Sequence, residues 1–114
     1  MIVSKPLLLT AVFALVAAGW TSTASAQDAV EQRGKEVFDY WCEACHGDGP
    51  GRPGTAALEV LYQGQKPALI EERDDLIPEL TRTFVREGIS IMPFFRKTKI
   101  SDEDLEALAA YLAP

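Results

Sequence analysis

The chain contains the stretch Cys42-Glu43-Ala44-Cys45-His46, which decides the fold because it predicts a cofactor at the centre of the domain. A C-x-x-C-H spacing is typical of covalent haem attachment. Residues three apart lie on one face of a helix, so both thiols can reach the two vinyl groups on one porphyrin edge and form thioethers. His46 follows directly and is expected to bind the iron as the proximal ligand. The stretch therefore predicts one haem c, bound covalently through Cys42 and Cys45.

Other interpretations of the two cysteines account for less of this pattern. A thioredoxin-like redox pair belongs to a βαβ context, and no such pattern surrounds these cysteines. A closed zinc site needs four ligands, whereas the chain has two cysteines and one histidine. A single disulfide, common in exported proteins, would leave His46 without a role. A haem-free, disulfide-stapled binding module is the alternative of a different class.

Met92 is the candidate for the second axial ligand of the iron. His46 is the only histidine, and the chain has no methionine besides Met92 and Met1. Methionine–histidine ligation raises the reduction potential of a haem, and Pro93 is expected to stiffen the loop. The alternative is that Met92 only fills the core, as a lone methionine usually does. With both axial positions filled no substrate reaches the iron, so we expect a one-electron carrier without catalytic residues, not an enzyme.

The N-terminal 26 residues are expected to be a secretory signal peptide. Lys5 is followed by an almost wholly apolar run over residues 6–20, and Ala24-Ser25-Ala26 has the small-residue pattern of a cleavage site. The alternative is an uncleaved anchor, but the run is shorter than the ~20 residues that span a bilayer. We therefore expect a periplasmic domain over 27–114 that is not inserted in the membrane. The whole chain has a formal net charge of −6. Such an acidic protein is a poor candidate for binding nucleic acid.

The remaining pattern predicts an all-α domain, with three to four short helices wrapped around one haem. Apolar residues at three- and four-residue steps predict a helix over 30–45, and residues 55–62 are compatible with a second, short one. Pro78 suits the first position of the next helix, and Gly88 ends it. The residues expected to pack around the haem are Phe38, Trp41, Leu58, Leu61, Leu69, Leu80, Phe84, Phe94 and Leu108.

The C-terminal part predicts a loop followed by the clearest helix of the chain. Residues 89–99 include Pro93 and have no helical start signal, so an extended loop is expected. Ser101 then opens a near capping box. Apolar residues follow at the i, i+3, i+4 and i+7 positions of one helical face: Leu105, Leu108, Ala109 and Leu112.

The sequence resembles the class I cytochrome c family over residues 31–112. Gly34, Phe38 and Cys42 are spaced four apart, as in that family's N-terminal helix, and Met92-Pro93 resembles its distal-ligand loop. The resemblance implies that Gly34 lets the C-terminal helix cross closely and that Tyr111 packs into this crossing. It also implies a proline carbonyl that accepts from Nδ1 of the haem histidine; Pro53 is the expected acceptor, with Pro50 as the alternative.

A narrower resemblance concerns the partner. Residues 84–112 are similar to the cytochrome subunit of flavocytochromes that oxidise 4-alkylphenols, of the p-cresol methylhydroxylase and eugenol hydroxylase type. This implies a flavin-containing dehydrogenase subunit as the electron donor. The alternative is a free soluble cytochrome c that serves a terminal oxidase or another dehydrogenase. A basic patch of Arg96, Lys97 and Lys99 is either a docking surface for such redox partners or a solvated loop.

Overall fold

The structure is a computed structural model that describes residues 22–114, with side chains described from Ser25 onward. The elements are α1 (Ser22–Trp41), α2 (Glu43–His46), α3 (Pro53–Tyr62), the 3-10 turn η1 (Ile70–Glu72), α4 (Pro78–Glu87) and α5 (Asp102–Leu112). Over residues 22–114 an isolated bridge between Ile89 and Met92 is the one β-type pairing, so the predicted all-α class is confirmed. The predicted signal peptide lies largely outside the described residues, and its proposed end at Ala26 falls within α1. None of the helices in this part of the chain is both long and apolar enough to span a membrane.

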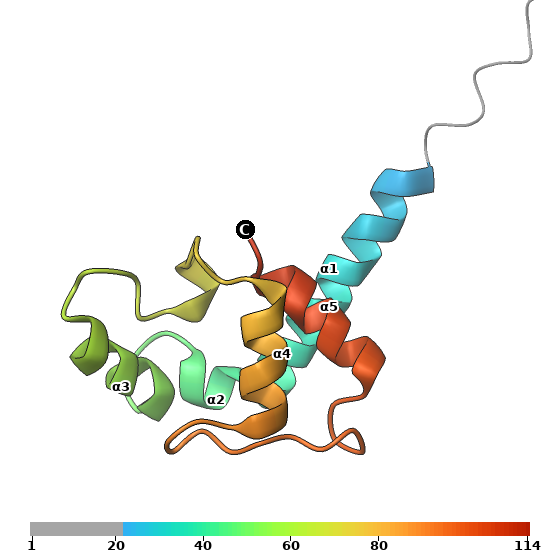
Figure 1. The fold of residues 1–114 in the computed structure, drawn as a ribbon. Helices are drawn as coiled ribbons and strands as arrows, with labels where there is room; N and C mark the ends of the chain where they lie inside the picture. Colours follow the sequence, from blue (N-terminus) through green and yellow to red (C-terminus); the bar gives the residue numbers. More distant parts are fainter. Residues whose placement is uncertain (1–21) are drawn as a thin grey trace, which may run out of the picture.

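The crossing of α1 and α5 organises the domain, as Figure 1 shows. Gly34 of α1 is buried and lies against the backbone carbonyl of Ala107 in α5, a contact that leaves no space for a Cβ atom. One turn further along each helix, the rings of Phe38 and Tyr111 lie 6.1 Å apart between centroids. The close crossing and the place of Tyr111 therefore agree with the cytochrome c pattern.

The core lies where the C-terminal half of α1 and the helix α4 each pack against α5. Ser101 caps α5 by accepting a hydrogen bond from the Asp104 backbone N–H at 3.0 Å, as the capping pattern predicts. Phe38 and Leu108 are almost completely buried, and each such side chain stabilises the fold by about 1.5–3 kcal/mol. The core side chains are Val37, Phe38, Leu76, Val85, Ile100, Leu105, Leu108 and Leu112.

The first predicted helix is interrupted at Cys42, which is why the described chain has five α-helices where three to four were expected. The Cys42 N–H donates to the Phe38 carbonyl at 2.8 Å and completes the last turn of α1. Its φ of −114° departs from helical geometry, and the one-turn helix α2 starts at the next residue. This break separates the long helix that packs against α5 from the short turn that carries Cys45 and His46.

Two of the nine residues expected to pack around the haem are instead exposed. Leu61 is 69% exposed and Phe94 is 55% exposed to solvent, so neither belongs to the protein core, and their packing against the haem stays a prediction. Phe38 and Leu108 are buried, and Trp41 and Leu80 pack against the core. The other three, Leu58, Leu69 and Phe84, are half-buried.

Candidate haem-binding site

The two cysteines and His46 are brought together by the short turn α2. The carbonyl of Cys42 accepts from the Cys45 N–H at 3.0 Å and from the His46 N–H at 2.8 Å. These bonds fix the three residues within one helical turn. Both cysteines are free thiols, with Cys42 half-buried and Cys45 exposed. Burial, with a smaller contribution from Cys45, raises the pKa of the Cys42 thiol to about 12, so it is protonated at neutral pH.

The imidazole of His46 is half-buried and has the state that an iron ligand needs. Desolvation lowers its pKa below the usual value, so the ring is neutral at neutral pH, and only a neutral imidazole can bind a metal. Neither ring nitrogen has a hydrogen-bond partner among the described residues, and Nδ1 is buried without one. A buried unpaired polar atom is costly, and a redox or catalytic role is one reason why a native structure keeps one.

The expected bond from His46 Nδ1 to the carbonyl of Pro53 is not formed, nor is one to Pro50. The physical reason is that Pro53 begins α3, and a carbonyl in the first turn of a helix points along the axis toward the next turn. Gly54 supports the ring instead. A Cβ atom at Gly54 would lie 2.8 Å from Cε1 and 2.9 Å from Nδ1 of His46, so the start of α3 lies directly against the imidazole.

The loop between α2 and α3 is held by one buried hydrogen bond. The hydroxyl of Thr55 donates to the carbonyl of Gly47 at 2.9 Å, which joins the end of α2 to the first turn of α3. Gly47 itself is buried. The loop therefore keeps Gly54 against His46, although its sequence of glycines and prolines predicts no defined shape.

Met92 lies in a tight turn directly after α4. The Met92 N–H donates to the Ile89 carbonyl at 2.9 Å, and the Ile89 N–H donates to the Met92 carbonyl at 3.1 Å. Gly88 makes this return possible, because its φ is +71° and a Cβ there would lie 2.7 Å from the Met92 carbonyl oxygen. Three residues later, the Phe95 N–H donates to the Val85 carbonyl at 2.7 Å and ties the turn to α4.

An aromatic contact joins the Met92 segment to the haem motif. The rings of Trp41 and Phe95 lie 5.9 Å apart and nearly perpendicular, at 72°, which is a favourable edge-to-face arrangement. Trp41 directly precedes Cys42, and Phe95 follows Met92 by three residues. Cys42 and Met92 both pack against the same core cluster. The structure thus packs the two parts of the predicted site, 46 to 50 residues apart in the chain, against the same core cluster.

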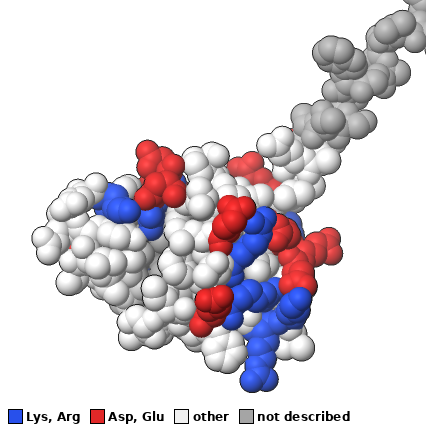
Figure 2. All heavy atoms as spheres, in the orientation of Figure 1, with Lys and Arg blue, Asp and Glu red and all other residues white. Residues whose placement is uncertain are grey.

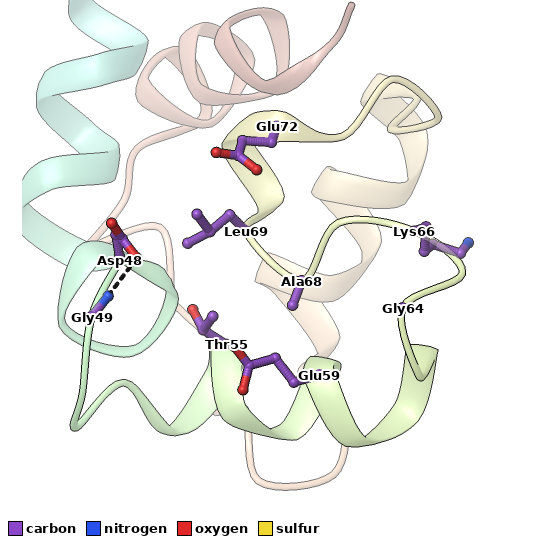
Figure 3. A pocket seen from close by; sticks show the side chains of 9 residues that line it. All are labelled: Asp48, Gly49, Thr55, Glu59, Gly64, Lys66, Ala68, Leu69 and Glu72. Carbon is purple, nitrogen blue, oxygen red and sulfur yellow. Dashed lines mark hydrogen bonds between the residues drawn. The ribbon is translucent and has the colours of Figure 1, made fainter.

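One cavity of the described residues lies away from the candidate attachment and ligand residues. It measures about 410 Å³ and lies between α3 and the segment that arches over it, as Figure 3 shows. None of Cys42, Cys45, His46 and Met92 lines it. Its walls are mixed, with apolar Ala68 and Leu69 beside Lys66 and three carboxylates. The described residues include no group of three or more acidic, cysteine or histidine side chains that could hold a metal ion. The cavity therefore excludes the four candidate attachment and ligand residues, although Leu69, which is expected to pack around the haem, lines it.

Sequence reasoning did not identify two residues that shape the site: Gly54 and Phe95. Each acts through a contact with a residue that is distant along the chain or through the backbone path of a loop. Hydrophobic periodicity and spacing carry no signal for such contacts. A glycine eight residues after the haem histidine is ordinary in a loop with four glycines.

Comparison with known proteins shows that the chain contains a cytochrome c-type domain. The family model described as "Cytochrome C oxidase, cbb3-type, subunit III" matches residues 29–112, and the chain therefore belongs to this family of c-type cytochromes. One similar protein is the "Cbb3-type cytochrome c oxidase subunit CcoP" of Azospirillum sp. (strain B510), which is 33% identical over 91 residues. The match covers 70% of this chain but 27% of that protein, so the chain spans about a quarter of its curated relative. No solved structure matches.

Membership of this family confirms the class I cytochrome c resemblance and implies covalently bound haem c and electron transport. It gives no support to the narrower resemblance to phenol-oxidising flavocytochromes, because the family and the relative are both described as oxidase subunits.

Proposed function

We propose that this protein is a monohaem c-type cytochrome that carries one electron at a time in the periplasm. Cys42 and Cys45 would hold the haem covalently, His46 would be the proximal ligand and Met92 the distal ligand. When bound, the haem supplies the one-electron couple of its iron. The chain itself supplies no catalytic group; its residues bind and orient the cofactor, exclude water and set the potential.

The observation that carries this proposal is the Trp41–Phe95 contact. It brings the helix end that bears Cys42 and the turn that bears Met92 onto the same core. A second observation is the neutral, partnerless imidazole of His46. A purely structural C-x-x-C pair would require neither feature, and the two cysteines are free thiols here, which does not favour the disulfide-stapled alternative.

We propose that this protein acts as a free cytochrome c. Its redox partner would be a terminal oxidase, to which it delivers electrons, or a dehydrogenase, from which it receives them. The relative named as an oxidase subunit supports the oxidase branch. A flavin-containing dehydrogenase subunit that oxidises 4-alkylphenols has only the resemblance over residues 84–112 in its favour. The proposed location follows from the predicted signal peptide, residues 1–26.

The proposed docking surface is smaller than the basic patch that the sequence suggests. Lys97 donates to Asp102 at 2.7 Å, so its charge is compensated. Arg96 lies over the Phe94 ring at 5.9 Å, and neither Arg96 nor Lys99 forms an ion pair with a described residue. Figure 2 shows acidic and basic side chains interleaved over α5 and the segment leading to it, whereas the surface over α2 and α3 is mostly uncharged. Exposed Phe94 and the two uncompensated cations are therefore the proposed contact for an acidic partner.

The test is to purify the protein from its native host and record its haem spectrum and its mass under denaturing conditions. The reduced protein is then mixed with host membranes that contain a terminal oxidase, and the oxidised protein is separately mixed with a flavoprotein fraction and a 4-alkylphenol. One covalent haem and oxidation by the membranes support the proposal. Haem reduction by the phenol would instead favour the flavocytochrome branch, and the absence of any covalent haem would refute both.

A further inference from the structure

Arg86, in the last turn of α4, is bonded to the segment that carries Met92. Its Nη1 donates to the backbone carbonyls of Phe95 at 3.0 Å and of Ile100 at 2.9 Å. Its Nη2 donates to a carboxylate oxygen of Asp102 at 2.9 Å. One guanidinium therefore connects the end of α4, two points of the loop and the first residue of α5. Figure 1 shows this loop running from the end of α4 to the start of α5.

The two bonds to backbone carbonyls matter because both are partly buried, whereas the bond to Asp102 is exposed. The Arg86 side chain is 22% exposed, and Ile100 is completely buried. Removing the donor would leave carbonyls without partners in a partly dry environment, where an unmade hydrogen bond costs more than a formed one contributes. The planar fork of an arginine suits several fixed acceptors better than an ammonium group does.

Phe95 transmits this restraint to Met92. Its N–H is bonded to the Val85 carbonyl and its carbonyl to Arg86, so its backbone is held on both sides. Its ring contacts Trp41. Only Pro93 and Phe94 separate Phe95 from Met92, and Pro93 has a restricted φ. The position of Met92 therefore depends on the position of Phe95.

We propose that Arg86 is a positioning residue that holds the Met92 turn against the haem motif and keeps the sixth position of the iron closed to external ligands. This inference rests on the proposed function, because it takes Met92 as the distal ligand. Arg86 does not touch the iron or the haem in this account; it acts through the backbone of Phe95 and Ile100.

Arg82 provides a matched control, since it lies one turn earlier on the same helix. Its guanidinium donates to both carboxylate oxygens of Glu106 and to Glu79. It thus joins α4 to α5 through side chains, and it has no bond to the loop between them. Arg86→Gln and Arg82→Gln remove the same charge from the same helix, and Arg86→Lys keeps the charge but loses the fork.

The experiment measures carbon monoxide binding to the ferrous holoproteins, together with hydrogen exchange of the peptide that covers residues 88–95. Circular dichroism checks that each variant is folded. For Arg86→Gln we expect about a tenfold or larger gain in carbon monoxide affinity and a comparable increase in exchange, the effect of losing bonds from a charged donor. Arg86→Lys should show much of the same change, and Arg82→Gln should remain close to the wild type.

Three results would overturn the proposal: unchanged binding and exchange in Arg86→Gln, equal effects in Arg82→Gln, or wild-type behaviour of Arg86→Lys, which would assign the effect to charge. A different result would identify a failure of the proposed function. If the wild type binds carbon monoxide as readily as Met92→Ala, Met92 is not the distal ligand. The exchange data would then still decide whether Arg86 holds the loop.

Discussion

Gly34 of α1 and Ala107 of α5 are in direct backbone contact: the place where a Cβ of residue 34 would stand is taken by the carbonyl oxygen of residue 107. This contact allows the two helices to cross closely. Phe38, one turn further along α1, is completely buried. Since α1 ends at the haem motif and α5 follows the Met92 segment, the crossing also sets the distance between the two halves of the candidate site.

Gly34→Ala tests this crossing, because two effects oppose each other. In a helix interior alanine is favoured over glycine by about 1 kcal/mol. Overpacking costs about 1–3 kcal/mol, and here the obstacle is backbone, which cannot rotate away. We expect a net loss of about 1–2 kcal/mol in the free energy of unfolding, measured by denaturant titration of the holoprotein. Gln32→Ala, on the exposed part of α1, should change it little. A Gly34→Ala variant as stable as the wild type would contradict the close contact.

Cys42→Ala tests covalent attachment. We expect haem to remain bound through Cys45 alone, since the second thiol and His46 stay in the same helical turn. One vinyl group would then remain conjugated, so the band of the pyridine haemochrome should shift to longer wavelength, and the yield of holoprotein should fall. Ala44→Ser, between the two cysteines, should keep the wild-type spectrum. Two saturated vinyl groups in Cys42→Ala would refute the assignment of this thiol.

Met92→Ala tests the distal ligand. The haem should stay attached, but the sixth position should open and the reduction potential should fall, because the thioether favours reduced iron. A decrease on the order of 0.2 V is expected, within the ~0.8 V that axial ligands span. Potentiometric titration and ligand-binding spectra measure both effects. Ile91→Ala, whose side chain is 73% exposed, is the control. An unchanged ligand spectrum in Met92→Ala would leave the methionine as a packing residue.

Tyr111→Phe tests the bond between the Tyr111 hydroxyl and the Glu71 carboxylate, which ties η1 to the helix crossing. Burial and this bond raise the pKa of Tyr111 well above its ordinary value. A raised pKa means that the stabilisation is fully present below the unfolded value of about 10 and decreases as pH rises above it. We expect the variant to lose about 1 kcal/mol or less at pH 7.

The pH dependence of this difference gives the check. Stability of the wild type and of Tyr111→Phe is compared from pH 7 to pH 11, and the gap should narrow only above about pH 10. Tyr40→Phe, whose side chain is 77% exposed, is the control and should cost less at pH 7. A gap between wild type and Tyr111→Phe that stays constant across this range would show that folding does not raise the pKa of Tyr111.

The sequence by itself determined the local features of this protein. The spacing of Cys42, Cys45 and His46 predicted a shared helical turn, because residues three and four apart on a helix are neighbours whatever surrounds them. Ser101 predicted the start of α5. The spacing of apolar residues along α5 predicted which face of that helix is buried, since capping and amphipathicity act within a few residues. The resemblance to the cytochrome c family could be recognised from the sequence because the motifs that carry it are also local.

Only the tertiary structure decided how the distant parts meet. Three contacts depend on the path of irregular backbone. They are the Trp41–Phe95 contact, the support of His46 by Gly54 in place of a Pro53 carbonyl, and the bonds of Arg86 to the Met92 loop. That path is set by packing against a core assembled from the whole chain. Neither periodicity nor composition describes it, because each reports on neighbours along the chain and not on neighbours in space.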